Sequence, residues 1–76
     1  MAKNDIEEKE GTVIESLPDG KFKIRLDDEE ETEVIGYLSG KMRRAKIFVL
    51  LGDKVKLEFT KYDDKIGRIT YRFKGK

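Results

Sequence analysis

The sequence predicts an all-β domain, a small closed barrel of five short strands with one helical connector. Apolar and polar residues alternate in five separate segments, which is typical of strands with one buried face. The chain has 76 residues and neither cysteine nor histidine, so one compact apolar core must hold it without disulfides or a zinc site. A cationic segment that lacks the alternation separates the third strand from the fourth.

The first two strands flank a tight turn. The first strand is predicted over residues 11–17. Pro18-Asp19-Gly20 forms the turn, because proline presets φ and glycine accepts a positive φ. The second strand, residues 21–27, alternates cleanly and is half-buried. Its inward residues are Phe22, Ile24 and Leu26.

An acidic loop and the connector surround the third strand. Residues 27–31 are five consecutive acids, and their mutual repulsion predicts a solvated loop tip. The third strand covers residues 32–38, with Val34, Gly36 and Leu38 on one face. A short helix is predicted over residues 39–45, with Ser39 as its N-cap.

The last two strands follow an apolar run over residues 47–51. The fourth strand, residues 54–60, buries Val55, Leu57 and Phe59. A loop is predicted over residues 62–65, and the fifth strand over residues 66–73. On the fifth strand, we expect Ile69, Tyr71 and Phe73 on the inner face and Arg68, Thr70 and Arg72 on the outer face.

These elements predict a five-stranded Greek-key barrel, the OB-fold, with its helical connector between strands three and four. Gly11 and Gly67 interrupt strands, where glycine often marks the bends that a small barrel needs. An open SH3-like barrel also has five short strands, but the place of the connector favours the OB-fold. We expect one OB-fold domain over residues 7–73, between a flexible tail at residues 1–6 and a basic tail at residues 74–76.

Charge is strongly segregated along the chain. Residues 1–38 hold five Lys/Arg and twelve Asp/Glu, a net charge of −7. Residues 39–76 hold twelve Lys/Arg and four Asp/Glu, a net charge of +8. A basic half of this density is the electrostatic footprint expected for nucleic-acid binding. The alternative, that these charges only solubilise a β surface, explains the segregation less well.

The candidate nucleic-acid contacts lie on the connector, on the outer face of the fifth strand and at three positions nearby. Cations there would neutralise phosphates and release counterions, and arginine also stacks on bases. An exposed tyrosine can stack on a base or cover the barrel rim. We expect Met42 to pack beneath the connector and Phe48 to join the core. The contacts are Lys41, Arg43, Arg44, Lys46, Arg68, Arg72, Tyr37, Lys61 and Tyr62.

The sequence argues against catalysis, metal binding and membrane insertion. Without histidine and cysteine, the commonest acid–base and thiol chemistry is unavailable, and the acids cluster in a loop and a tail. Residues 36–42 only superficially match a phosphate-binding loop, and the acidic run lacks the ligand spacing of a calcium loop. No apolar run approaches about 18 residues, and the charged N-terminus does not resemble a signal peptide. We therefore expect a soluble cytoplasmic protein with no cofactor and no small-molecule substrate.

Several short motifs occur in order over essentially the whole chain, and together they resemble bacterial and plastid translation initiation factor 1. They are Gly11-Thr12-Val13, Ser16-Leu17-Pro18, Phe22, Ser39-Gly40-Lys41-Met42-Arg43, Leu50, Gly52-Asp53-Lys54-Val55, Tyr62-Asp63 and Gly67-Arg68-Ile69. The resemblance implies a non-catalytic OB-fold monomer that binds the aminoacyl-tRNA site of the small ribosomal subunit. It implies contact with the decoding helix of the rRNA, a neighbouring ribosomal protein and the other two initiation factors.

The resemblance also implies that the factor blocks premature tRNA entry, in the cytoplasm or in the plastid stroma. It places rRNA contacts on Lys41, Arg43, Arg44, Arg68 and Arg72. Three positions depart from the usual family pattern. Lys46 stands where an aromatic residue is usual, Phe48 where arginine is frequent, and Tyr37 where many bacterial members have histidine.

Two other classes of protein remain open. A general single-strand binder of the cold-shock kind is also a small barrel, but its strand surface is rich in aromatic residues rather than alternating charges. A protein–protein adaptor would use the acidic half of the chain.

Overall fold

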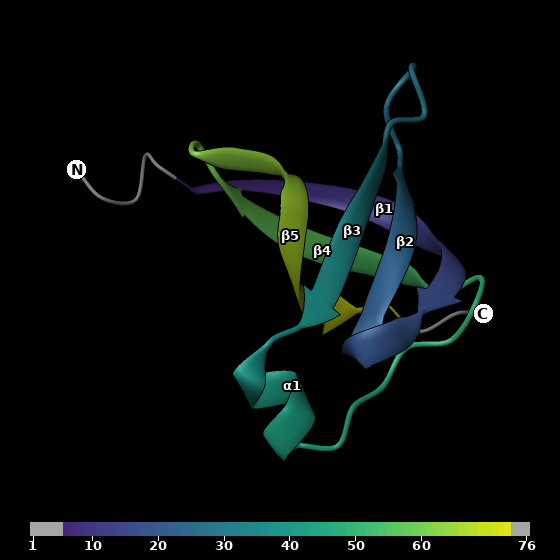
Figure 1. The fold of residues 1–76 in the computed structure, drawn as a ribbon, viewed down its shortest axis with the longest axis vertical. Helices are drawn as coiled ribbons and strands as arrows, with labels where there is room; N and C mark the ends of the chain where they lie inside the picture. Colours follow the sequence, from purple (N-terminus) through teal and green to yellow (C-terminus); the bar gives the residue numbers. More distant parts are fainter. Residues whose placement is uncertain (1–5, 74–76) are drawn as a thin grey trace.

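The computed structural model describes residues 6–73, with the backbone alone at position 64, and forms a closed barrel. Its strands are arranged in the order β1-β2-β3-β5-β4, and β4 closes onto β1 (Figure 1). The β3–β5 pair is parallel and the other four pairs are antiparallel. The elements are β1 (Ile6–Leu17), β2 (Lys21–Leu26), β3 (Glu33–Leu38), α1 (Gly40–Arg44), β4 (Lys54–Thr60) and β5 (Asp63–Arg72).

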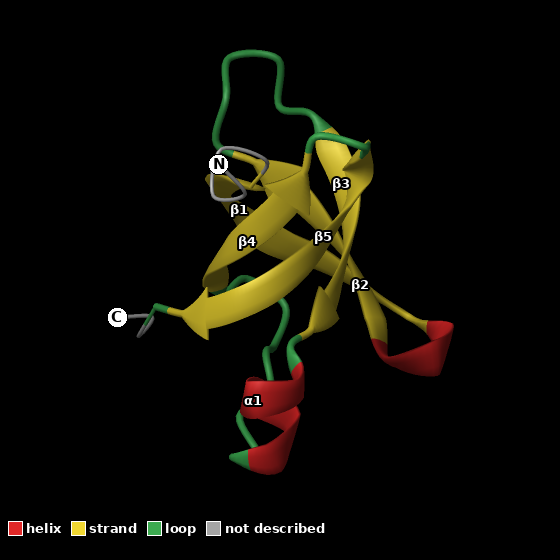
Figure 2. Cartoon of the chain, turned by 90° about the vertical axis from the view of Figure 1, so that its left-hand side faces the viewer, coloured by secondary structure: helices red, strands yellow, loops and turns green. Residues whose placement is uncertain are grey.

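This arrangement confirms the predicted OB-fold, including the helix between β3 and β4 (Figure 2). The turn at Pro18–Gly20 is confirmed as well, with positive φ at Asp19 and Gly20. Of the two predicted tails, residues 1–5 and 74–76 lie outside the described residues, whereas Ile6 begins β1.

Strand β1 begins at Ile6, five residues before the predicted start. Its first half pairs with β4 and its second half with β2, so this one strand joins β2 and β4 and closes the barrel. The sequence signal was absent there because residues 7–10 are all charged. Gly11 lies where the two pairings overlap, and a Cβ at that position would lie 2.6 Å from the Arg25 carbonyl oxygen. Only glycine allows this close approach of β1 to β2.

The core forms inside the barrel from the alternating apolar residues of all five strands, together with Met42 and Val49. Burial of these side chains is the main favourable contribution to folding in a domain without disulfides. Phe22 is half-buried and packs against the core. The buried set is Val13, Ile24, Leu26, Val34, Leu38, Met42, Val49, Val55, Leu57, Phe59 and Ile69.

A bulge in β5 overturns part of the predicted face assignment. Leu57 pairs with Ile69 and Lys56 pairs with Tyr71, so Thr70 is an extra residue in β5. The extra residue reverses the alternation beyond it. Tyr71 is therefore 54% exposed rather than inward, and its ring contacts Phe73 edge to face, with centroids 5.0 Å apart. Arg72 is likewise moved off the face that carries Arg68.

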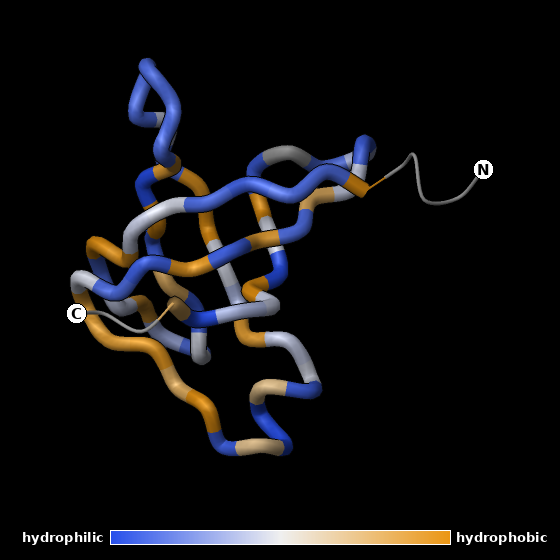
Figure 3. The backbone as a smooth tube through the Cα atoms, turned by 180° about the vertical axis from the view of Figure 1, so that it is seen from behind, coloured by the Kyte–Doolittle hydropathy of each residue, from blue (hydrophilic) through white to orange (hydrophobic). Residues whose placement is uncertain are grey.

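The apolar run over residues 47–51 is a loop, and most of it is exposed. Only Val49 of this run is buried, whereas Phe48 is 58% exposed and Leu50 and Leu51 are similar. In Figure 3 the run is the orange stretch of the tube that passes outside the barrel. The expectation that Phe48 joins the core is therefore wrong. The segment forms no strand, and its far end is tied to β1 by backbone hydrogen bonds between Val13 and the Gly52-Asp53 pair. Without a ladder to fix the alternation, an apolar run does not define a buried face.

Candidate nucleic-acid interface

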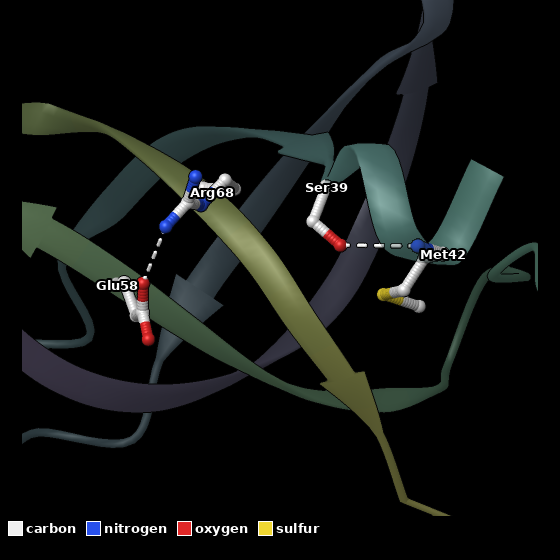
Figure 4. Close-up of polar contacts among 4 residues, drawn as sticks. All are labelled: Ser39, Met42, Glu58 and Arg68. Atoms are coloured by element: carbon white, nitrogen blue, oxygen red, sulfur yellow. Dashed lines mark hydrogen bonds and ion pairs between the residues drawn. The ribbon is translucent and has the colours of Figure 1, made fainter. Parts of the chain in front are cut away.

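Helix α1 is anchored to the end of the barrel at both its cap and its inner face. The Ser39 Oγ accepts a hydrogen bond from the Met42 backbone N–H at 3.2 Å (Figure 4). The Ser39 backbone N–H donates to the carbonyl of Ile69 on β5 at 3.0 Å. Met42 is 4% exposed and joins the core. The predicted cap and the predicted burial of Met42 are both confirmed.

Four exposed cations lie in α1 and directly after it. Among the described residues, no carboxylate lies within the 4.0 Å ion-pair distance of any of them. The chain turns sharply at the last of the four, Lys46, whose φ is 60°. Their charge is therefore available to an anionic partner. These connector cations are Lys41, Arg43, Arg44 and Lys46.

The lysines of the barrel wall are different, because carboxylates neutralise them. Lys54 lies 2.8 Å from the Asp27 carboxylate, whose hydrogen bond raises the pKa of Lys54 above its ordinary value. Lys56 lies 3.9 Å from Glu8, across the β1–β4 pairing. Acids from the negative half of the sequence thus cancel cations from the positive half. The basic surface therefore does not extend over Lys54 and Lys56.

Arg68 joins the connector cations through a hollow between α1 and β5. Its Nη2 donates to the Glu58 Oε1 at 2.8 Å, and this hydrogen bond raises the pKa of the guanidinium (Figure 4). The helix hollow, about 480 Å³, is lined by Lys41, Arg44, Glu58 and Arg68 among others. Tyr37, 39% exposed, is the register neighbour of Arg68 on the parallel strand β3. It also shares a second hollow with Arg43.

Three of the candidate contacts lie elsewhere. Arg72 donates from Nε to the Asp53 Oδ2 at 2.9 Å, so a carboxylate holds it away from Arg68. Lys61 and Tyr62 form the turn between β4 and β5, at the end of the barrel away from α1 (Figure 1). There the Lys61 ammonium lies 5.7 Å from the centroid of the Tyr62 ring. The structure therefore gathers the connector cations, Arg68 and Tyr37, but not these three residues.

Comparison with known proteins decides what kind of barrel this is. The family model described as translation initiation factor 1A / IF-1 matches residues 1–76. The chain belongs to this family of translation initiation factors. It is 51% identical to the chloroplastic translation initiation factor IF-1 of Dioscorea elephantipes and 52% identical to that of Antirrhinum majus. Each alignment spans 67 residues, 88% of this chain and 84% of the relative.

A solved structure agrees with this assignment. The solution structure of translation initiation factor IF-1 from the Wolbachia endosymbiont strain TRS of Brugia malayi is 44% identical, with a TM-score of 0.76. The match covers 93% of this chain and 82% of that one. Both the predicted fold and the predicted family are therefore confirmed. The family is one of translation initiation factors, and membership implies association with the small ribosomal subunit.

The sequence does not single out one residue of this initiation factor's surface, Glu58, and it predicts the wrong environment for another, Phe48. Glu58 is the partner of Arg68, and its outward place in β4 was available from the alternation. Phe48 lies exposed in a hollow of about 370 Å³ with Phe22, Tyr37 and Arg43. The sequence does not indicate that Phe48 is exposed, because an apolar run predicts buried side chains. No helix in the described part of the initiation factor is long and apolar enough to span a bilayer.

Proposed function

We propose that this initiation factor occupies the aminoacyl-tRNA site of the small ribosomal subunit and contacts the decoding helix of its rRNA. From there it blocks premature tRNA entry and supports the other two initiation factors. The observation that carries the proposal is the set of connector cations without carboxylate partners among the described residues. They lie at one pole of the long axis, and the acidic loop over residues 27–31 lies at the other (Figure 1).

The proposed action is binding rather than turnover. The connector cations neutralise rRNA phosphates and release counterions, which makes affinity fall steeply with salt. Displacing a base from the decoding helix costs a few kcal/mol per unstacked step, and arginine contacts offset part of that cost. The acidic pole points away from RNA, or toward the basic segments of a neighbouring ribosomal protein.

The proposed compartment is one that contains bacterial-type small subunits, the bacterial cytoplasm or the plastid stroma. The stroma is supported by the chloroplastic relatives, which are about half identical to this chain over the 67 aligned residues. Tyr37, which stands where many bacterial members have histidine, also favours the stroma.

Co-sedimentation with purified small and large ribosomal subunits, over about 50 to 200 mM salt, tests the proposal. The variant Arg43→Gln/Arg44→Gln removes two connector cations, and Lys54→Gln/Lys56→Gln is a control with the same change in charge. We expect saturable binding to the small subunit alone, weakened by the first variant and kept by the second. A ligand of the aminoacyl-tRNA site should compete with the factor. Equal losses in both variants would contradict the placement of the interface.

A general single-strand binder is the second candidate, and the exposed aromatic residues Tyr37 and Phe48 favour it. It requires stacking that resists salt, on free single strands as well as on both subunits. The same experiment with an unstructured RNA oligonucleotide separates the two functions.

A further inference from the structure

The Arg68–Glu58 ion pair stands between two hollows and lines both of them. One is the helix hollow. The other, which we name the strand hollow, measures about 260 Å³ and is lined by Tyr37, Glu58, Asp63, Ile66 and Arg68 among others. Glu58 is 25% exposed and Arg68 50% exposed at the side chain, so the ion pair is reachable from solvent.

The two hollows differ in charge. In the helix hollow, Lys41, Arg44 and Arg68 face the single carboxylate of Glu58. In the strand hollow, Arg68 is the only cation among the described residues and faces two carboxylates, Glu58 and Asp63. A phosphate is therefore attracted to the helix hollow and repelled from the strand hollow.

The walls of the strand hollow suit a flat, partly apolar ring instead. Tyr37 is 39% exposed and Ile66 is 44% exposed, so both present apolar surface to the space. Aromatic side chains provide stacking surface for unpaired bases. Phosphate and base are attached to the same sugar, so one nucleotide can extend from one hollow into the other.

We propose that the strand hollow binds an unpaired guanine base, read by Glu58 and Arg68 together, while the helix hollow holds its phosphate. This inference rests on the proposed function. Guanine carries two adjacent N–H donors, on N1 and N2, beside the O6 acceptor. The Glu58 carboxylate accepts from both donors and the Arg68 guanidinium donates to O6. A carboxylate offers about four lone-pair positions and a guanidinium five N–H donors, so the ion pair itself stays intact.

Glu58 thus gives Arg68 a role that the connector cations do not have. Its hydrogen bond fixes the guanidinium before RNA binds, and its charge keeps phosphates away. Without Glu58, Arg68 would act as one more phosphate-binding cation.

Amide NMR of the full-length chain, titrated with the four nucleosides, tests the proposal without any phosphate present. We expect guanosine to perturb Tyr37, Gly67 and Arg68, with an affinity roughly five- to thirtyfold above that for adenosine, cytidine or uridine. Glu58→Gln keeps the size of the side chain and should abolish this preference. Asp53→Asn breaks the equivalent ion pair to Arg72 and should leave it intact.

A second measurement distinguishes recognition of the base by Glu58 from a purely structural role of this residue. Freed from Glu58, Arg68 should neutralise one more phosphate, so the log–log salt slope of small-subunit binding should steepen by about one in Glu58→Gln. A purely structural Glu58 would weaken binding without steepening the slope. The proposal fails if the four nucleosides act alike, if another base is preferred, or if Glu58→Gln keeps the guanosine preference. Because Arg43→Gln/Arg44→Gln should keep the guanosine response while losing subunit binding, failure of this proposal and of the proposed function are distinguishable.

Discussion

At Gly11, the backbones of β1 and β2 leave no room for a side chain. A Cβ there would lie 2.6 Å from the Arg25 carbonyl oxygen, which belongs to a rigid strand and cannot move aside cheaply. We expect Gly11→Ala to lower the free energy of unfolding by about 1–3 kcal/mol, measured by urea denaturation. Gly40, in α1, has no heavy atom within 4 Å of such a Cβ. Gly40→Ala should therefore leave stability unchanged or raise it by up to about 1 kcal/mol, and a loss equal to that of Gly11→Ala would refute the steric argument.

Asp28 ties the acidic loop together by a charged hydrogen bond. Its Oδ1 accepts from the Thr32 backbone N–H at 3.0 Å, and this bond lowers the pKa of the carboxyl below its ordinary value of 3.8. Because the folded-state pKa lies below the unfolded-state value, the stabilisation is present above pH 3.8 and is lost as the pH falls through the folded-state pKa.

Thermal unfolding of the wild type and Asp28→Asn across about pH 5 to 3 tests this linkage. Asparagine keeps the acceptor oxygen but not the charge. We expect the wild type to be the more stable protein at the upper end and to lose that advantage at the lower end. A difference in melting temperature that stays constant with pH would show that the charge of Asp28 contributes nothing.

At the scale of the element, α1 is too short to be stable alone. A helix of five residues is far below the length at which isolated helices form, so its cap and its buried residue must hold it. We expect Ser39→Ala to cost about 1 kcal/mol of stability, since the Met42 N–H loses its acceptor. Hydrogen exchange at Met42 should accelerate and small-subunit binding should weaken. Ser39→Thr keeps the hydroxyl and serves as the control, and unchanged exchange in Ser39→Ala would contradict the role of the cap.

The elements also show how far the sequence predicts this fold. Alternation located β2, β3 and β4 to within about a residue, because each has a buried face with a period of two. It missed residues 6–10 of β1, which are held by pairing with β4 and by ion pairs such as Lys56–Glu8 rather than by apolar burial. It also missed the bulge at Thr70, since an extra residue is visible only when the partner strand is known.

In the candidate site too, local sequence patterns could be predicted and contacts between strands could not. The connector cations could be found because they lie close together in the sequence, in α1 and directly after it. The prediction for Arg72 was wrong because the bulge in β5 changes the face on which it lies. Lys61 and Tyr62 lie apart from the connector cations because β4 ends on the other side of the barrel from α1. Glu58 could not be predicted as a site residue, because its role depends on an ion pair with Arg68 on the neighbouring strand.

At the scale of the whole molecule, the two oppositely charged halves of the sequence do not become two faces. The β1–β4 pairing brings them together, and ion pairs such as Lys54–Asp27 cancel much of their charge. What remains is concentrated at the poles of the long axis, the connector cations at one and residues 28–31 at the other (Figure 1). The net charge of +1 is small, but the surface is not nearly neutral, because opposite charges at the two poles form a dipole.

The acidic pole should act against wrong binding rather than for correct binding. It repels RNA that approaches from the far end, so it suppresses encounters in which the connector cations point away. We expect Glu29→Gln/Glu30→Gln/Glu31→Gln to bind large subunits and unrelated RNA several-fold more tightly at about 50 mM salt, with small-subunit affinity little changed. The added binding should disappear near 200 mM salt, because the charges involved are exposed and screened. If this variant kept the selectivity of the wild type at low salt, repulsion at the acidic pole would have no part in recognition, and the connector cations alone would set the choice of partner.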